Sequence, residues 1–147
     1  MRIIAVDLFP VNKPGYVERL DGAENLPALL AESDYVVVTV PFTPQTENML
    51  GEREFAQMKQ GAYLVGVSRG GIINERALAS ALRSGRLCGA ALDVCEREPL
   101  PADSELWDLP NLLLTTHTAG GSQYELERLY TIFSGNLKRF LRGEFPL

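Results

Sequence analysis

Three side chains of complementary chemistry stand far apart along the chain: Arg69, Glu98 and His117. A guanidinium can hold a carboxylate through two parallel hydrogen bonds. His117 is the only histidine, and an imidazole titrates near neutral pH, which suits proton transfer. A carboxylate within reach of it, such as that of Glu98, would orient the ring and stabilise its protonated form. Together these groups would supply an anion clamp, an acid and a base around one crevice.

Each of these residues, taken singly, has a simpler structural interpretation. A lone histidine is usually structural or exposed, a loop arginine is usually solvated, and acids such as Asp93 and Glu98 are usually surface charges. All of them nevertheless follow apolar runs of strand length. Because ligands bind at the carboxyl ends of the strands in open α/β sheets, the shared position favours a functional interpretation.

Apolar runs of strand length alternate with helical patterns along the chain. Strands are expected at residues 2–7, 35–40, 62–67, 87–94 and 111–116, and helices at residues 25–32, 52–58, 74–84 and about 122–141. The strand runs are continuous rather than alternating, which is typical of strands covered on both faces. Asn74 suits the N-cap of the third helix, and Gly85 suits the left-handed position after it. The order predicts an α/β fold with a doubly wound parallel sheet, in one domain over residues 1–147.

The last expected helix carries apolar residues at helical spacing, which favours core packing. This stripe comprises Leu126, Leu129, Ile132, Phe133, Leu137, Phe140 and Leu141. Gly143 is expected to end the helix.

Composition excludes several classes of partner. The 147 residues include 14 Lys and Arg against 19 Asp and Glu, for a net charge of −5. No basic face is therefore expected for a nucleic acid. No run approaches the roughly 20 apolar residues of a membrane helix, and the first apolar run is too short for a signal peptide. Cys88 and Cys95 show no metal-ligand spacing and are too few for a disulfide framework, although the sequence leaves a single disulfide between them as an alternative. A reducing, cytoplasmic setting fits best.

Asp7 ends the first expected strand. In a dinucleotide-binding sheet, an acid at the end of the second strand accepts hydrogen bonds from ribose hydroxyls and repels a 2′-phosphate. The alternative is a turn residue before Pro10. The sequence has no G-x-G-x-x-G turn before its first strand, and Gly120-Gly121 begins the last helix, too late to replace it. Either the chain binds no dinucleotide, or it begins one βα unit late.

Four segments carry a family resemblance by their order and spacing. They are VPFTPQT at residues 40–46, SRGGIINE at 68–75, LDV at 92–94 with EPL at 98–100, and LTTHTAG at 114–120. Together they resemble the NAD-binding domain of the D-isomer-specific 2-hydroxyacid dehydrogenases, relatives of glyoxylate/hydroxypyruvate reductases and phosphoglycerate dehydrogenases, over nearly the whole chain. The resemblance implies a Rossmann-like domain lacking its first βα unit, NAD as cofactor, a small 2-oxo or 2-hydroxy acid as substrate, and a homodimer.

The same resemblance implies a role for each matching residue. Arg69 corresponds to the residue that holds the substrate carboxylate, Glu98 to the histidine partner, and His117 to the acid/base. Asp7 corresponds to the ribose acid, which implies NAD rather than NADP, and Asp93 to the acid beside the nicotinamide carboxamide. The implied cofactor-binding positions also include Pro41, Thr46, Val67, Arg69, His117 and Gly120.

Several alternatives stay open at this point. The family's corepressor-like relatives are NAD-sensing dimeric interaction modules, and they can keep the same arginine, glutamate and histidine. An inactive fragment is a further alternative.

Cys95 stands where the family often has an aromatic residue, and Thr116 where it often has proline, so the resemblance implies that both can change the substrate fit. The chain alone is expected to bind NAD weakly, because it lacks the glycine-rich turn.

Overall fold

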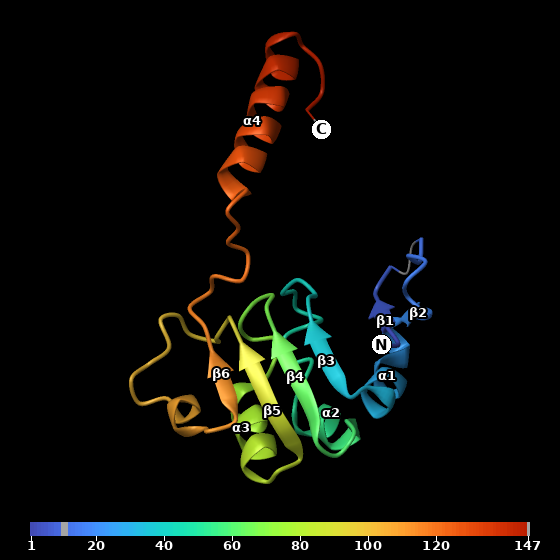
Figure 1. Ribbon diagram of the computed structural model, residues 1–147, viewed down its shortest axis with the longest axis vertical. Coiled ribbons are helices and arrows are strands. Elements are labelled where there is room, and N and C mark those ends of the chain that lie inside the picture. The colour runs from blue at the N-terminus through green and yellow to red at the C-terminus, as the bar shows by residue number, and fades with distance from the viewer. Residues whose placement is uncertain (10–11, 147) are drawn as a thin grey trace. The chain divides into compact units, whose positions relative to one another are not determined.

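The computed structural model describes residues 1–9 and 12–146. It divides into two compact units, Met1–His117 and Thr118–Leu147. The first unit contains two parallel sheets with helices, and the second contains one long helix (Figure 1). Pro10, which the turn interpretation of Asp7 invoked, lies outside the described residues.

The smaller sheet has two parallel strands, β1 (Ile4–Asp7) and β2 (Arg19–Gly22). β2 was not expected from the sequence, because its four residues, RLDG, form no apolar run. A short 3-10 helix, η1 (Ala23–Asn25), leads from β2 into α1 (Leu26–Glu32), which precedes the second sheet. The first expected strand and helix are thus present, each somewhat shorter than expected.

The larger sheet has four parallel strands in the order β3-β4-β5-β6. These are β3 (Tyr35–Val38), β4 (Ala62–Gly66), β5 (Leu87–Leu92) and β6 (Leu112–Leu114). The helices α2 (Glu52–Gln57) and α3 (Glu75–Arg83) connect β3 to β4 and β4 to β5, and η2 (Glu105–Asp108) precedes β6. The predicted α/β, Rossmann-like class is confirmed. Because all four strands run in parallel, their carboxyl ends meet at one edge (Figure 1).

The parallel strands form two sheets, where the sequence predicted one. Within residues 1–9 and 12–146, no strand pairs with the second edge of β1 or with the outer edge of β3. A hollow lined by residues 1–6 and 32–40, among others, lies between these two edges. Among the described residues between β1 and β3, the elements are β2, η1 and α1, and β2 pairs with the far side of β1. The break therefore follows from the absence of a strand to fill it.

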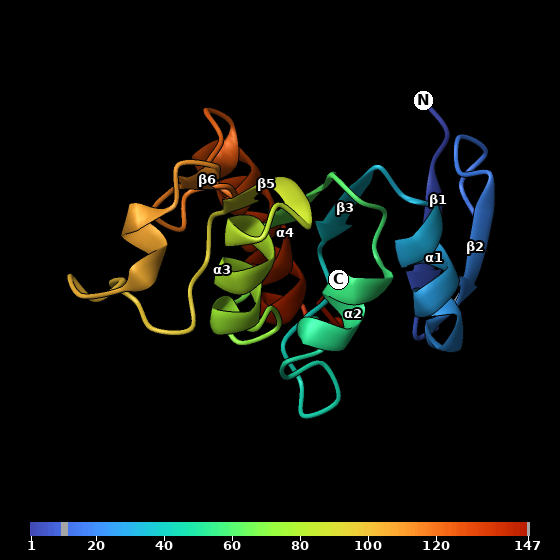
Figure 2. The same cartoon turned by 90° about the horizontal axis from the view of Figure 1, so that it is seen from below.

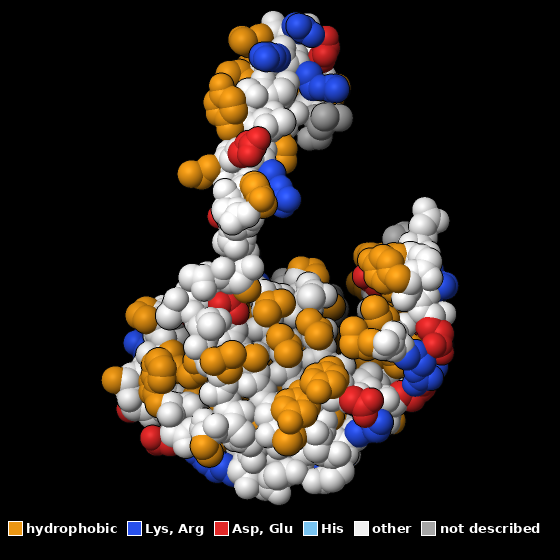
Figure 3. All heavy atoms as spheres, in the orientation of Figure 1, with side chains coloured by type: hydrophobic (Ala, Val, Ile, Leu, Met, Phe, Trp, Pro, Cys, Tyr) orange, Lys and Arg blue, Asp and Glu red, His pale blue; other side chains and the backbone are white. Residues whose placement is uncertain are grey.

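Helices α2 and α3 lie on the same face of the four-stranded sheet (Figures 1 and 2). On that side β3 buries Val36 and Val38, and on the other side it exposes Tyr35 and Val37. The Tyr35 ring stacks on that of Tyr63, with 5.2 Å between centroids. Figure 3 shows apolar side chains gathered over this second face. The expectation that the strands are covered on both faces is therefore not met within the described part of the chain.

The core lies between the four-stranded sheet and its helices, and α3 shows why the sequence folds as it does there. Leu78 and Leu82 are buried on one side of α3. The predicted cap is confirmed, because Ala77 N–H donates to Asn74 Oδ1 at 2.9 Å. Gly85 has the predicted left-handed φ, of 69°. Both ends of α3 are therefore set by local sequence, and the strand ends that α3 connects are positioned with it.

The second unit contains α4 (Glu125–Leu141), the longest of the described helices. It begins a turn later than about residue 122, because Ser122 forms a turn in which its carbonyl accepts from Glu125 N–H at 3.0 Å. It ends at Leu141 as predicted, with Gly143 at a φ of 73°. None of its residues is buried, so the core packing expected of its apolar stripe is not observed. Among all the helices described, none combines the length and apolar content needed to cross a bilayer.

Candidate active site

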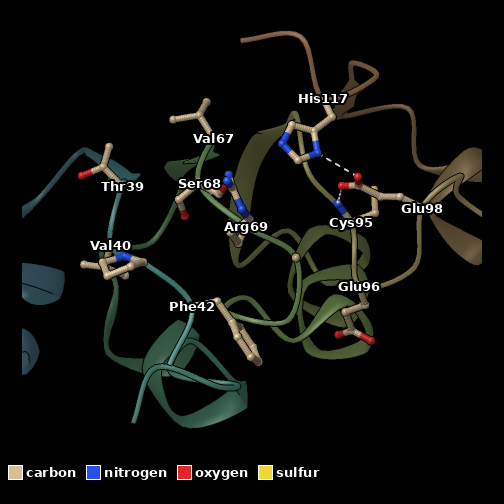
Figure 4. Close-up of a pocket in the computed structure, with 12 residues that line it drawn as sticks. Thr39, Val40, Phe42, Val67, Ser68, Arg69, Cys95, Glu96, Glu98 and His117 are labelled. Carbon is tan, nitrogen blue, oxygen red and sulfur yellow. Dashed lines mark hydrogen bonds and ion pairs between the residues drawn. The ribbon is translucent and has the colours of Figure 1, made fainter. Parts of the chain in front are cut away.

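A hydrogen bond between Glu98 and His117 lies at the centre of the site. The ring Nδ1–H of His117 donates to Glu98 Oε2 at 2.8 Å, and about two-fifths of each side chain is exposed. The second oxygen, Oε1, accepts from Cys95 N–H at 3.0 Å. The other edge of the ring, with Nε2, faces the side on which Arg69 lies (Figure 4). The carboxylate thus orients the imidazole and leaves Nε2 toward the cavity.

The charge state of Glu98 follows from the same contacts. The hydrogen bond from His117 holds the pKa of the Glu98 carboxyl below its usual range, and the Cys95 backbone N–H lowers it further. An ionised carboxylate only accepts hydrogen bonds, so it favours the ring form with its proton on Nδ1. In the neutral ring, Nε2 is then the acceptor. This arrangement lets Nε2 take a proton from a bound hydroxyl group and return it.

The backbone of His117 is itself unusual. Its φ is 58°, in the left-handed region that non-glycine residues seldom adopt. Such a conformation costs on the order of 1–3 kcal/mol and persists where the surrounding structure enforces it. Here the preceding segment is anchored, since Thr115 N–H donates to Leu92 O at 3.0 Å. The turn after β6 therefore brings the imidazole to the carboxyl edge of the sheet.

Arg69 contributes a cation to the same cavity. It follows β4, and its Nη1 donates to Ser68 O at 2.7 Å. The cavity has a volume of about 790 Å³ and is lined by Arg69, Glu98 and His117 together (Figure 4). Sites for small molecules usually measure roughly 300–1,000 Å³. The structure thus brings the three predicted catalytic residues to one place, while their chemical roles stay predictions.

The predicted cofactor-binding residues fall into two groups. Pro41 and Val67 line the cavity and offer apolar surface beside Arg69 and His117. Thr46 does not line it, and its hydroxyl instead donates to Pro41 O at 2.8 Å, which fixes the turn that carries Pro41. Apolar walls beside a cation and an imidazole suit a flat, uncharged ring such as the dihydronicotinamide of NADH.

Two further acids lie away from this cavity. Asp93 is 5% exposed and accepts a hydrogen bond from the Thr115 hydroxyl at 2.5 Å. Asp7 lies at the carboxyl end of β1, where its exposed side chain accepts from Phe9 N–H at 2.8 Å. That contact is the local turn that its structural interpretation predicts. Gly120 belongs to the second unit and is exposed there. The structure thus does not bring Asp7, Asp93 or Gly120 into the cavity that Arg69 and His117 line, and the sequence has no G-x-G-x-x-G turn for a pyrophosphate.

Several residues at the site were not singled out from the sequence. Phe42 and Glu96 line the cavity, together with Cys95, which the resemblance had already indicated as a residue that affects the substrate fit. At Gly70, an added Cβ would lie 1.8 Å from Cys95 O, so only glycine fits. The Gly70-Gly71 pair was the one sequence signal for this close approach, because glycine permits backbones to meet. Glu75 contacts Glu96 from outside the cavity, and no spacing in the sequence indicates that pairing.

The family model and the curated relatives that match this chain point to one family. The profile of the family described as D-isomer specific 2-hydroxyacid dehydrogenase, NAD binding domain, matches residues 1–119. A glyoxylate reductase from Korarchaeum cryptofilum is 40% identical over 148 residues, which cover 99% of this chain and 44% of the relative. The chain therefore spans under half the length of that relative.

Solved structures agree with this comparison. A D-isomer specific 2-hydroxyacid dehydrogenase family protein from Aeromonas salmonicida superposes with a TM-score of 0.89 at 36% identity, covering 98% of this chain and 46% of that one. A D-isomer specific 2-hydroxyacid dehydrogenase from Xanthobacter autotrophicus, solved with NADPH and MES, superposes with a TM-score of 0.82 at 32% identity, covering 100% of this chain and 69% of that one. Both likenesses cover nearly all of the fold described above.

Proposed function

This chain belongs to the D-isomer specific 2-hydroxyacid dehydrogenase family, as an NAD-binding domain, and we propose that it is the coenzyme-binding part of an NAD-dependent oxidoreductase. The reaction proposed is hydride transfer between the nicotinamide and C2 of a small 2-hydroxy or 2-oxo acid. The observation that carries the proposal is the hydrogen bond from His117 to Glu98, made in the cavity that Arg69 also lines.

The residues of this chain divide the work in the proposed reaction. The Arg69 guanidinium binds the substrate carboxylate and polarises the carbonyl oxygen. Nε2 of His117 receives the hydroxyl proton during oxidation and returns it during reduction, while Glu98 stabilises the imidazolium in between. Bound NAD supplies the hydride acceptor, and NADH the donor. Pro41 and Val67 are the residues that would hold the nicotinamide against this group.

The preference for NAD over NADP, the location and the oligomeric state are also part of the proposal. The exposed Asp7 carboxylate at the end of β1 would repel a 2′-phosphate, which supports NAD. Both cysteines are free thiols, which supports a cytoplasmic, reducing setting. The apolar residues exposed on β3 and β4 offer a surface for a homodimer.

The experiment uses the longer protein of which we propose this chain to be the coenzyme-binding part. We expect it to reduce glyoxylate or hydroxypyruvate with NADH more efficiently than with NADPH, as followed by nicotinamide absorbance. The His117→Asn variant should lose about 10²–10⁴-fold in kcat with little change in the KM for NADH, because the acid/base is removed. Asparagine tolerates a positive φ, so this variant keeps the local backbone.

A matched pair of arginine variants tests the anion clamp. Arg69→Ala should raise the KM for the 2-oxo acid, whereas Arg76→Ala, at an exposed position on α3, should leave it unchanged. Near-normal turnover by His117→Asn would contradict the role given to His117. A wild-type protein that binds NADH but reduces no 2-oxo acid would favour an interaction module instead.

A further inference from the structure

Two glutamates outside the proposed reaction exchange hydrogen bonds. Glu75 N–H donates to Glu96 Oε1 at 3.0 Å, and Glu96 N–H donates to Glu75 Oε1 at 2.6 Å. Glu75 is the first residue of the nine-residue helix α3, where backbone N–H groups have no partner within the helix. Glu96 lies in the loop that follows β5. The reciprocal pair therefore ties that loop to the start of a helix.

The same loop is held from a second side. The Cβ of any residue larger than glycine at position 70 would lie 1.8 Å from Cys95 O and 2.8 Å from Glu96 N. The backbone after β4 thus lies directly against the backbone after β5. From this fixed segment, Cys95 N–H donates to Glu98 Oε1 at 3.0 Å. The loop that carries Glu98 is therefore held between residue 70 and the first turn of α3.

The pairing of two carboxylates needs a reason, since like charges repel. Burial and the charge of Glu96 raise the pKa of the Glu75 carboxyl above its usual range, while the Glu96 backbone N–H lowers it. Each carboxylate accepts a backbone N–H, and the N-terminus of α3 favours negative charge. Glu75 does not line the cavity. Its contacts are therefore directed at the loop rather than at a ligand.

We propose that Glu75 is a positioning residue, which acts through Glu96 to fix the loop that carries Glu98 and thereby orients the His117 imidazole. The structural part of this inference stands on the contacts above. Its kinetic part rests on the proposed function, so the two are tested by separate measurements.

The first measurement is the ring tautomer of His117, read by proton–nitrogen NMR of this chain. As the only histidine, His117 gives a single pair of ring nitrogen signals. Glu75→Asp keeps an acid at the helix start, but its side chain is one methylene too short to reach Glu96 N–H. We expect the ratio of Nδ1–H to Nε2–H tautomers to fall roughly tenfold in this variant, the loss expected for one hydrogen bond to a charged group.

Two further variants separate the reach of the side chain from its charge. Glu75→Gln keeps an oxygen acceptor of the same length and should keep the wild-type tautomer ratio. Glu52→Ala, at the corresponding first position of α2, should also leave the ratio unchanged. If Glu75→Asp lowers the melting temperature but leaves the ratio as in the wild type, the role of Glu75 is only structural and the proposal is wrong. The proposal is equally wrong if Glu75→Gln behaves like Glu75→Asp.

The second measurement is kinetic and uses the longer protein. Glu75→Asp should lower kcat by roughly ten- to a hundredfold, since a small misplacement of a catalytic group has effects of this size. The KM for the 2-oxo acid should change little, because Arg69 is not held by Glu75. Glu75→Gln should restore kcat. If the wild-type protein shows no turnover, the proposed function fails, while the tautomer ratio still decides the positioning role.

Discussion

Glu98 is the residue on which the site depends, because both of its carboxylate oxygens accept hydrogen bonds. One comes from the His117 ring and the other from the Cys95 backbone. The first fixes the imidazole, and the second fixes the carboxylate to its own loop. A glutamate held in this way stays ionised and orients the ring before any substrate arrives, which is the preorganisation that favours proton transfer.

Removing the imidazole should raise the pKa of Glu98. In a His117→Ala variant, the main contact that lowers this pKa is lost and only the Cys95 N–H remains. A carboxyl with a lowered pKa in the folded state contributes stability above its unfolded value, about 4.3 for glutamate. That contribution is lost as the pH falls through the folded value. The variant should therefore lose less stability than the wild type on acidification.

Carbon NMR titration of the Glu98 carboxyl measures the pKa, and urea unfolding at several pH values measures the stability. Glu52→Ala is the matched control, because this glutamate has no contact with the imidazole. A Glu98 titration that is identical in the wild type and His117→Ala would show that the ring does not set the carboxylate's charge.

The sequence predicted the positions of some site residues better than those of others. Arg69 and His117 were located by the strands they follow, since the carboxyl ends of parallel strands share an edge. Asp93 directly follows β5, yet it contacts Thr115 and lies outside the cavity lining. Thr46, in a turn well after β3, contacts Pro41 and also lies outside that lining. Sequence order shows that a residue follows a strand but does not give the direction of its side chain. For the same reason, the Glu75–Glu96 pairing could not be predicted.

At the scale of elements, α3 connects stability with the site. The Asn74 side chain accepts from Ala77 N–H and also donates to Asn48 Oδ1 at 2.9 Å. Asn74→Ala should lower the free energy of unfolding by about 1 kcal/mol, the usual effect of losing an N-cap. Asn74→Asp keeps the cap acceptor and loses only the donation to Asn48, so it should lose less. Urea denaturation measures both, and equal losses would show that the cap contributes nothing.

The elements themselves were mostly predictable, and their ends were not. The strand expected at residues 35–40 ends at Val38, because Thr39 and Val40 already belong to the loop that lines the cavity. The strand expected at residues 87–94 ends at Leu92, where its pairing with Leu114 also ends. Apolar runs continue past the last ladder pair, so hydrophobicity alone overestimates strand length. β2 escaped prediction because it is short and polar.

At the scale of the whole molecule, the sequence predicted the order of the elements but not the division into two sheets. An apolar run indicates that a strand forms, and only its neighbours decide which edges are paired. The edges of β1 and β3 that face the hollow have no partner strand among the described residues. Unpaired parallel edges can pair with other chains. We therefore expect self-association of this chain, and the homodimer likewise stays a prediction.

Because of the break between β1 and β3, the backbone amides of the two sheets should exchange with solvent at different rates. We expect the amides of β4, bonded to a strand on each side, to exchange for deuterium slowest. Those of β1 and β2, which share a single ladder, should exchange far sooner. Mass spectrometry of deuterated peptides measures both, and one uniform rate would contradict the division. The four-stranded sheet, which carries Arg69 and His117, would then stay folded while β1 and β2, with Asp7, open transiently to solvent.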